Sequence, residues 1–466
     1  MNNLNRREFL GAAGTLAAPL RKRPNILFLM PDQLRAQALG YMGNRDVRTP
    51  HIDRLAGESL VVRNTLANTP VCCPARAVLL TGQYAHRNGM VANDLRLREN
   101  SIGLAKTLRH AGYRTGFIGK WHLDGGPRMP GYVPPGPRRQ GFEFWAANEC
   151  SHQHFDTQYF RDSAEPIPIR KFEPEAWTDL GIEFLRAADK RPWFLTIQMG
   201  PPHDPYKAPP EYARRYDPAR LTMRPNWRKA ERAPGPEAIA EYYGMITAID
   251  DQVGRILREL ETLGMAEDTI VLFSSDHGDM LGSHGLRLKR KPWEESVLVP
   301  GIIRYPRALK RGTSDCIFTH VDFAPTLLGF CGIQPPAGMQ GADLSGPLAG
   351  KGQGPDSAFF QIFGPYAGDG TDDGWRGVRT RRYMYARYES RPWVLYDLEK
   401  DPYQMNNLAD SKPLVDQMER RLNEWMSRTG DSWKYNWHAP VEDNGRLYRS
   451  KTFYTVDEYL AWAKEQ

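Results

Sequence analysis

Residues 26–33 read ILFLMPDQ, an apolar run that leads directly into a carboxylate and an amide. A short continuous apolar run is typical of a strand that is buried on both faces of a parallel sheet. Residues 115–122, 193–204 and 269–277 repeat the arrangement, since each apolar run leads toward lysine, histidine or aspartate side chains. Because these runs alternate with helical patterns, the sequence predicts an α/β fold with a mainly parallel central sheet flanked by helices.

The remaining elements divide the chain into two parts. Residues 236–263 carry apolar side chains at helical spacing and predict a long helix. From residue 356 onward, β-like runs separated by turns precede an amphipathic segment at 412–427. We therefore expect an α/β domain over residues 24–350 and a C-terminal subdomain over 356–466, which consists of a small antiparallel sheet with one helix.

Composition and charge exclude several classes of protein. The chain has 466 residues, of which 41% are hydrophobic and 25% charged, with a formal net charge of +7. These values argue against a disordered chain and against a protein with many membrane spans. The basic residues are dispersed and no nucleic-acid recognition motif is present, so we expect no nucleic-acid partner. The five cysteines are scattered and odd in number, which excludes a disulfide scaffold.

The N-terminal segment has the order of a bacterial export signal. Arg6 and Arg7 precede a phenylalanine, a leucine and an apolar stretch of small residues at 11–20, which is too short to span a bilayer. Paired arginines in this order predict twin-arginine export of an already folded chain. The sequence thus predicts a signal over residues 1–20, no integral membrane segment, and a periplasmic or secreted protein. A frayed basic tail is the alternative.

Polar side chains at the strand ends form a candidate metal site. The carboxyl ends of parallel strands meet at one edge of the sheet, where ligands bind. Two adjacent pairs of residues at these ends supply mainly oxygen ligands and one imidazole nitrogen: Asp32, Gln33, Asp276 and His277. Ca²⁺ or Mg²⁺ suits the oxygens, and the imidazole also permits Mn²⁺. The alternative is that each aspartate only caps a following turn or helix.

Residues 72–76 read CCPAR and predict the start of a helix that ends at Gly82. Cys72 then lies at the helix N-terminus, where the dipole favours negative charge. Arg76 lies four residues later, on the same helix face, and can bind an anionic oxygen. A buried inert cysteine pair and half of a metal site are the alternatives, although adjacent cysteines lack the spacing of a zinc site.

The sequence resembles the type I sulfatases of the alkaline phosphatase superfamily. The run C-x-P-x-R at 72–76 with LTG at 80–82, and GYRT at 112–115 with GKWH at 119–122, resemble both signature segments of that family. Further matches follow in the family's order at residues 24–32, 49–56, 202–206, 250–254, 275–278, 322–328 and 395–398. The resemblance covers most of the chain and implies an alkaline-phosphatase-like fold and hydrolysis of a sulfate ester, on a sulfated carbohydrate.

The same resemblance implies roles for individual residues. Cys72 is expected to be converted by a formylglycine-generating enzyme to Cα-formylglycine, whose hydrate is the nucleophile, while a divalent metal, Ca²⁺ by preference, binds the sulfate. His122 is expected to accept a proton as the aldehyde re-forms, and His203 to protonate the leaving oxygen. Three cations are expected to stabilise the charged oxygens: Arg76, Lys120 and Lys289.

Two features of the family pattern leave alternatives open. Lys289 is chosen for its spacing from the EES run at 294–296, but Lys291 lies in the same basic stretch. Gln33 and His277 replace the more usual aspartate and asparagine, and both variants resemble subgroups that include phosphonate and phosphate monoester hydrolases. A phosphonate or phosphate ester hydrolase is therefore one alternative function. A noncatalytic binder of sulfated glycans is another, but it requires a broken site, whereas every aligned catalytic position is filled.

Substrate contacts are predicted from position only. His152 and His154 lie in a region that resembles a substrate-contacting insertion of sulfatases. Asn93, with Asp94, Arg96 and Arg98, follows the Cys72 helix and could likewise bind substrate. For both histidines a surface or satisfied core position is the alternative.

Overall fold

The computed structural model describes residues 23–125, 131–187, 189–363 and 374–433. The predicted export segment at residues 1–20 lies outside these residues. None of the helices in the described ranges is long and apolar enough to cross a bilayer.

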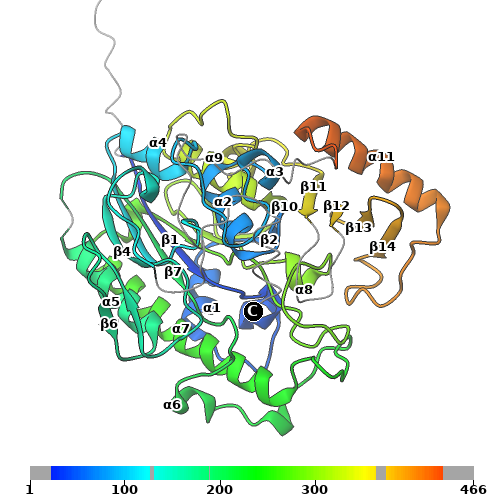
Figure 1. Ribbon diagram of the computed structural model, residues 1–466, viewed down its shortest axis with the longest axis horizontal. Helices are drawn as coiled ribbons and strands as arrows, with labels where there is room; N and C mark the ends of the chain where they lie inside the picture. Colours follow the sequence, from blue (N-terminus) through cyan, green and yellow to red (C-terminus); the bar gives the residue numbers. More distant parts are fainter. Residues whose placement is uncertain (1–22, 126–130, 188, 364–373, 434–466) are drawn as a thin grey trace, which may run out of the picture.

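A central sheet of eight strands organises the larger part of the chain (Figure 1). Its order is β10-β2-β9-β8-β1-β7-β3-β4. All pairings are parallel except those of the short strand β9 with β2 and β8. The predicted mainly parallel sheet is therefore confirmed. The strand bounds are β1 Asn25–Pro31, β2 Leu60–Leu66, β3 Arg114–Lys120, β4 Phe144–Asn148, β7 Trp193–Met199, β8 Thr269–Phe273, β9 Ile302–Arg304 and β10 Gly312–Thr319.

Helices cover both faces of this sheet, as the alternation along β1 requires. Leu27 and Leu29 belong to a core cluster with α1 Pro50–Gly57, α5 Glu173–Arg186 and α7 Pro236–Thr262. Alternate side chains of β1 point to the opposite face. Ile26 and Phe28 accordingly belong to a second cluster, whose helices are α2 Cys72–Thr81, α4 Leu104–His110 and α9 His320–Phe330. Figure 1 shows these two groups of helices on either side of the sheet.

The C-terminal part is the predicted antiparallel sheet with one helix, α11 Lys412–Thr429. Its strands pair in chain order: β11 Ser357–Ile362, β12 Trp375–Thr380, β13 Tyr383–Tyr388 and β14 Pro392–Asp397. Val378 and Leu422 belong to the same core cluster as Ile317 of β10, so the smaller sheet packs continuously onto the larger part. This packing also encloses the segment between β8 and β9.

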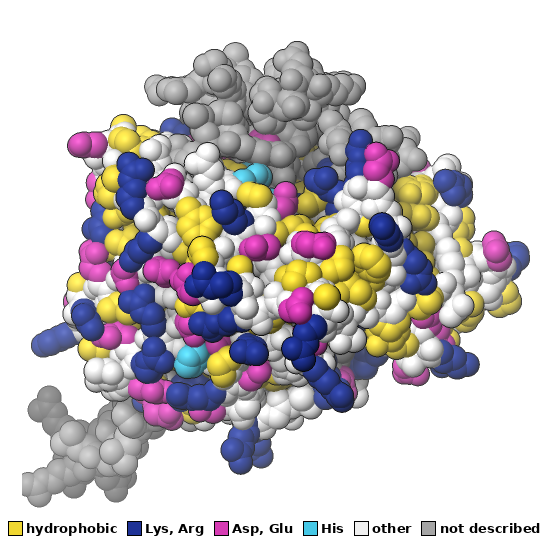
Figure 2. All heavy atoms as spheres, turned by 90° about the horizontal axis from the view of Figure 1, so that it is seen from below, with side chains coloured by type: hydrophobic (Ala, Val, Ile, Leu, Met, Phe, Trp, Pro, Cys, Tyr) yellow, Lys and Arg dark blue, Asp and Glu magenta, His cyan; other side chains and the backbone are white. Residues whose placement is uncertain are grey.

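Short elements complete the described chain. They are α3 Ala85–Asn88, α6 Pro210–Ala213, α8 Glu294–Val297 and α10 Ser345–Leu348, the two-stranded sheet of β5 Thr157–Tyr159 and β6 Ile167–Ile169, and several turns of 3-10 helix. Figure 2 shows basic and acidic side chains interspersed over one face of the molecule. The positive net charge is thus dispersed on this face rather than gathered into one patch.

Candidate active site

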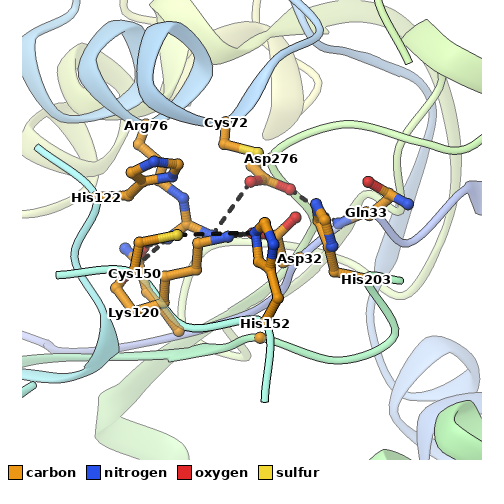
Figure 3. A network of polar contacts seen from close by, with 12 residues as sticks. Asp32, Gln33, Cys72, Arg76, Lys120, His122, Cys150, His152, His203 and Asp276 are labelled. Carbon is orange, nitrogen blue, oxygen red and sulfur yellow. Dashed lines mark hydrogen bonds and ion pairs between the residues drawn. The ribbon is translucent and has the colours of Figure 1, made fainter. Parts of the chain in front are cut away.

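The polar strand ends meet above the carboxyl edge of the central sheet, opposite the N-terminus of α2 (Figure 3). Asp32 and Gln33 directly follow β1, and Lys120 is the last residue of β3. His203 follows β7, and Asp276 and His277 follow β8. Because all four strands are parallel, their carboxyl ends bring these side chains together. The residues that meet here are Asp32, Gln33, Cys72, Arg76, Lys120, His122, His203, Asp276, His277 and Lys289.

Two buried carboxylates are held by two buried cations. Asp32 Oδ2 accepts from Arg76 Nη2 at 2.9 Å and from Lys120 Nζ at 2.7 Å, and Asp276 Oδ2 accepts from the same Arg76 nitrogen at 3.1 Å. Burial and the Cys72 thiol oppose the charge on Asp32, but Lys120 and Arg76 outweigh them and hold its pKa well below its ordinary range. Asp32 is therefore available as an anionic ligand, and the Asp276 side chain lies beside it on the same guanidinium.

The donor set fits a divalent cation. Potential ligand atoms of Asp32, Cys72, Asp276 and His277 all lie within 4.8 Å of one another, and all four residues are buried. His277 Nδ1 lies 2.9 Å from the Gly278 carbonyl, so Nδ1 carries the proton and Nε2 presents its lone pair. This Nε2 lies 3.7 Å from both carboxylates. Asp32 Oδ1 is buried without a hydrogen-bond partner among the described residues, as expected for an oxygen that faces a cation.

Gln33 borders this cluster on the side of Lys289. Its Oε1 accepts from Lys289 Nζ at 2.5 Å, and its Nε2 donates to Asp279 Oδ2 at 2.7 Å. The backbone N–H of Gln33 donates to Asp276 Oδ1 at 3.0 Å, which ties the two strand ends together. The amide orientation is thus fixed by a carboxylate on one side and an ammonium on the other.

Lys289 reaches the cluster from the basic stretch. Its Nζ lies 2.8 Å from His203 Nε2 and 2.5 Å from Gln33 Oε1. The neighbours Leu288 and Arg290 have φ of 61° and 70°, in the left-handed region that non-glycine residues rarely adopt. The loop therefore has an uncommon conformation that directs Lys289 inward.

Cys72 is the first residue of α2 and lies among cations. Its Sγ is 3.3 Å from His277 Nε2. Burial opposes ionisation of this thiol, but Lys289 and Lys120 outweigh it and bring the pKa of Cys72 well below 9.0. Burial raises the pKa of the adjacent Cys73 to about 11. The two neighbouring thiols thus have opposite electrostatic environments.

Arg76 supports the cluster from the second turn of the same helix. Its Nη1 donates to the Lys120 carbonyl at 2.9 Å and to Gln198 Oε1, in addition to the carboxylates. A guanidinium with partners fixed on two sides is a rigid donor rather than a mobile one. Its position depends on Gln198, a polar residue within the otherwise apolar strand β7.

The predicted substrate residues divide into two groups. The His152 ring stacks on the His203 ring, with centroids 4.4 Å apart and planes at 19°, so His152 lies at the site. His154 is buried with its Nε2 2.6 Å from the His203 carbonyl, where it supports the loop instead. Asn93 Oδ1 accepts from the Cys73 backbone N–H at 3.0 Å, which engages the Asn93 carbonyl oxygen with α2.

Several residues that contact the cluster were missed by sequence reasoning. The carboxylates of Asp279 and Asp204 lie 2.7 Å and 3.3 Å from the amide nitrogen of Gln33. Asp279 Oδ2 also accepts from Tyr206 OH at 2.5 Å. Asp204 directly follows His203, Asp279 lies two residues after His277, and Gln198 interrupts an apolar strand. These positions were the available signals.

The chain was compared with known families and proteins. A family profile described as Sulfatase matches residues 24–333, and one described as N-sulphoglucosamine sulphohydrolase, C-terminal, matches residues 282–430. The chain is 37% identical to the Ulvan-active sulfatase of Formosa agariphila over 426 residues, which cover 88% of this chain and 83% of that protein. It is 28% identical to the N-acetylglucosamine-6-O-sulfatase of Bacteroides thetaiotaomicron, with 89% and 88% of the two chains covered.

Solved structures agree with this assignment. A structure in complex with its substrate D-glucosamine-2-N,6-O-disulfate superposes with a TM-score of 0.79 at 26% identity and covers 88% of this chain and 99% of that one. The phosphonate monoester hydrolase of Agrobacterium radiobacter, at 23% identity and a TM-score of 0.72, covers 92% of this chain and 100% of that one and shares the fold. The family profile spans well over half of the chain and the signature segments lie at the cluster, so this chain belongs to the sulfatase family and is a sulfuric ester hydrolase.

Proposed function

We propose that the protein hydrolyses a sulfate ester on a carbohydrate, with Cα-formylglycine formed from Cys72 and a bound divalent cation. The observation that carries this proposal is the position of Cys72 between the carboxylate pair and three cationic side chains, Arg76, Lys120 and Lys289. A sulfuryl group bound there has its negative oxygens next to fixed positive charges, which is an electrostatic arrangement suited to its transfer. The carbohydrate is supported by the similarity to sulfatases named for ulvan and for N-acetylglucosamine 6-sulfate.

The residues of this chain then have separate roles. Asp32, Gln33, Asp276 and His277 would hold the cation, which acts as a Lewis acid toward the sulfate oxygens. The hydrated aldehyde at position 72 supplies the nucleophile and a second hydroxyl that allows sulfate to be released. His122 accepts a proton on the α2 side of the cluster, and His203 donates one to the leaving oxygen. His152 stacks on His203 and would lie beside the leaving alcohol of the substrate.

Calcium is the proposed ion. Two carboxylates and one amide oxygen favour a hard cation, and Ca²⁺ accepts the irregular arrangement of such ligands more readily than Mg²⁺. The imidazole of His277 is the feature that favours Mn²⁺. Metal exchange therefore distinguishes among the three.

A phosphonate or phosphate ester hydrolase is the second candidate. The observation that favours it is that two of the four proposed ligands, Gln33 and His277, carry no negative charge. A less anionic ligand set leaves more positive charge on the metal, which suits the dianionic phosphoryl group of a phosphate monoester. The similarity of fold to a phosphonate monoester hydrolase is compatible with either reaction.

We also propose how the chain matures and where it acts. Residues 1–20 are proposed to direct twin-arginine export to the periplasm or the exterior, after a formylglycine-generating enzyme has converted Cys72. The proposed catalytic domain covers residues 24–350, and the proposed C-terminal subdomain covers 356–466. Export of the folded chain is consistent with a site that must receive its modification and metal first.

The test is to produce the protein with and without a formylglycine-generating enzyme. Mass spectrometry of the peptide that contains Cys72 and Cys73 should show sulfur replaced by oxygen at position 72 only. Converted enzyme should release sulfate from a panel of sulfated mono- and oligosaccharides, while Cys72→Ala should not. Full turnover by a preparation whose Cys72 is entirely thiol would contradict the mechanism, and higher kcat/KM on the phosphonate ester of the same alcohol would favour the second candidate.

A further inference from the structure

His122 is paired with a carboxylate to which sequence analysis gave a different role. Asp94 was predicted only as a possible contact for substrate, but its Oδ1 lies 3.0 Å from His122 Nε2. Both side chains are 2% exposed or less. A buried carboxylate that meets a buried imidazole fixes which ring nitrogen carries the proton.

The position of Asp94 is set by the nucleophile helix. The backbone N–H of Asp94 donates to Cys73 Sγ at 3.1 Å, and Asn93 Oδ1 accepts from the Cys73 backbone N–H at 3.0 Å. The loop is therefore attached at two points to the residue that directly follows Cys72. A displacement of the backbone at residues 93–94 relative to α2 would break both contacts.

The other ring nitrogen of His122, Nδ1, is available for proton transfer. Nδ1 is buried and has no hydrogen-bond partner among the described residues. The thiols of Cys72, Cys73 and Cys150 lie around the ring, and Lys120 and Glu149 are the nearby ionisable groups besides Asp94. A buried polar atom without a hydrogen-bond partner is uncommon. His122 Nδ1 would gain a partner once Cys72 is converted, because the hydrate at position 72 can exchange a proton with it.

We propose that Asp94 is a positioning residue for His122. It holds the imidazole as the tautomer with its proton on Nε2 and thereby presents the basic Nδ1 to the group at position 72. When Nδ1 receives a proton, Nε2–H stays bonded to Asp94, and the carboxylate remains ionised beside the imidazolium. The inference rests on the proposed function for the role of His122, but the tautomer itself does not depend on it.

The same logic applies in serine proteases, where a buried aspartate orients the catalytic histidine. Replacement of that aspartate by asparagine lowers kcat by about 10⁴ because the amide stabilises the wrong tautomer. Asp94→Asn is expected to have the same effect here, since its amide N–H would donate to Nε2 and move the ring proton to Nδ1. The substitution preserves shape, and so it changes the proton position more than the packing.

The first measurement needs neither the modification nor the metal. Protein with Cys72 as a thiol is labelled with ¹⁵N-histidine, and the ring nitrogen shifts identify the protonated nitrogen; the His122 signals are assigned from their loss in His122→Gln. Wild type is expected to carry its proton on Nε2, and Asp94→Asn on Nδ1. A wild-type ring protonated only on Nδ1, or an unchanged tautomer in Asp94→Asn, would overturn the proposal. If Asp94→Asn does not fold, the wild-type result alone decides.

The second measurement uses converted enzyme. Asp94→Asn is expected to lower kcat by 10²- to 10⁴-fold with KM nearly unchanged, while alcohol release in the first turnover stays fast, because His122 acts after that step. Asp124→Asn is the matched control, since Asp124 is a buried carboxylate whose Oδ1 accepts from Arg138 Nε at 2.8 Å. Equal slowing of first-turnover alcohol release and of sulfate release would overturn the inference. Absence of sulfate release by wild type would instead contradict the proposed function.

Discussion

Lys289 Nζ lies 2.8 Å from His203 Nε2, so the ammonium donates to the lone pair of a neutral imidazole. The other nitrogen, Nδ1, lies 2.7 Å from the Asp204 carbonyl, to which it donates its proton. Nε2 therefore faces the cluster as a base with a cation next to it. A substrate oxygen that replaces this contact would meet a histidine and a lysine together, and this pair can deliver a proton to it.

His203→Ala should affect poor leaving groups most. A sugar alkoxide needs a proton in the transition state, and general acid catalysis is worth on the order of 10²- to 10⁴-fold, whereas a nitrophenolate hardly needs it. The measurement is kcat/KM for wild type and variant across aryl sulfates of graded phenol pKa, together with a sugar sulfate. An unchanged dependence on leaving-group pKa would exclude the acid role and leave His203 as a binder of sulfate oxygens.

Asp276→Asn should abolish metal binding at the cluster. The substitution removes one of two anionic ligands and one partner of Arg76. Isothermal titration of metal-free protein with Ca²⁺ should show binding in wild type and none in the variant, and a chelator should abolish wild-type activity. Asp250→Asn, at a buried carboxylate that contacts the start of α1 instead, is the control and should bind Ca²⁺ normally. Reactivation by Mn²⁺ alone would speak against calcium.

Arg379→Ala should destabilise the whole fold. Arg379 of β12 makes two bonds to the buried carboxylate of Glu294 in α8, at 2.8 Å and 3.0 Å. Loss of the cation leaves an unpaired buried charge, which costs about 3–5 kcal/mol of unfolding free energy. Arg382→Ala, which removes a more exposed pair with Asp397, should cost far less unfolding free energy in the same chemical denaturation experiment, because solvent screens that pair. Similar losses in both variants would contradict this account.

His320→Gln should reduce the sensitivity of the fold to acid. His320 is buried with Nε2 3.0 Å from the Ser275 carbonyl, and burial lowers its pKa from 6.5 to about 3. The unfolded chain therefore binds this proton first, so the stability contribution is complete above pH 6.5 and falls as the pH drops toward 3. Between pH 7 and pH 5, wild type should lose about 2 kcal/mol more than the variant in urea unfolding. Parallel losses would mean that His320 titrates normally in the folded state.

The strands that could be predicted from the sequence are the ones buried in the middle of the sheet. β1, β7 and β8 are largely apolar because they lie in the middle of the sheet with helices on both faces, and this composition is visible in the sequence. β10 is an edge strand whose first half is largely exposed and polar, and β9 has only three residues. Neither was predicted, because strand identity there depends on pairing with distant segments rather than on composition.

The site was predictable where a strand end supplied the residue. Asp32 and Asp276 follow buried strands, so the sheet geometry alone brings them together. The contacts that orient these groups were not predictable in the same way. Asp94 reaches His122 because a loop adopts an uncommon backbone conformation, with φ of 64°, and is attached to α2. Such a contact depends on tertiary packing, and tertiary packing of a loop leaves no periodic pattern or fixed spacing in the sequence.

The smaller sheet has a consequence for recombination between relatives. Trp375 Nε1 donates to the Arg290 carbonyl at 2.9 Å, one residue after Lys289, and the Arg379 pair holds Glu294 a few residues further on. The loop that carries Lys289 is thus held in place by residues of β12 in the smaller sheet. A chimaera joined near residue 355 would inherit its catalytic lysine from one parent and the anchor of that lysine from the other, so the two segments are expected to evolve as one unit.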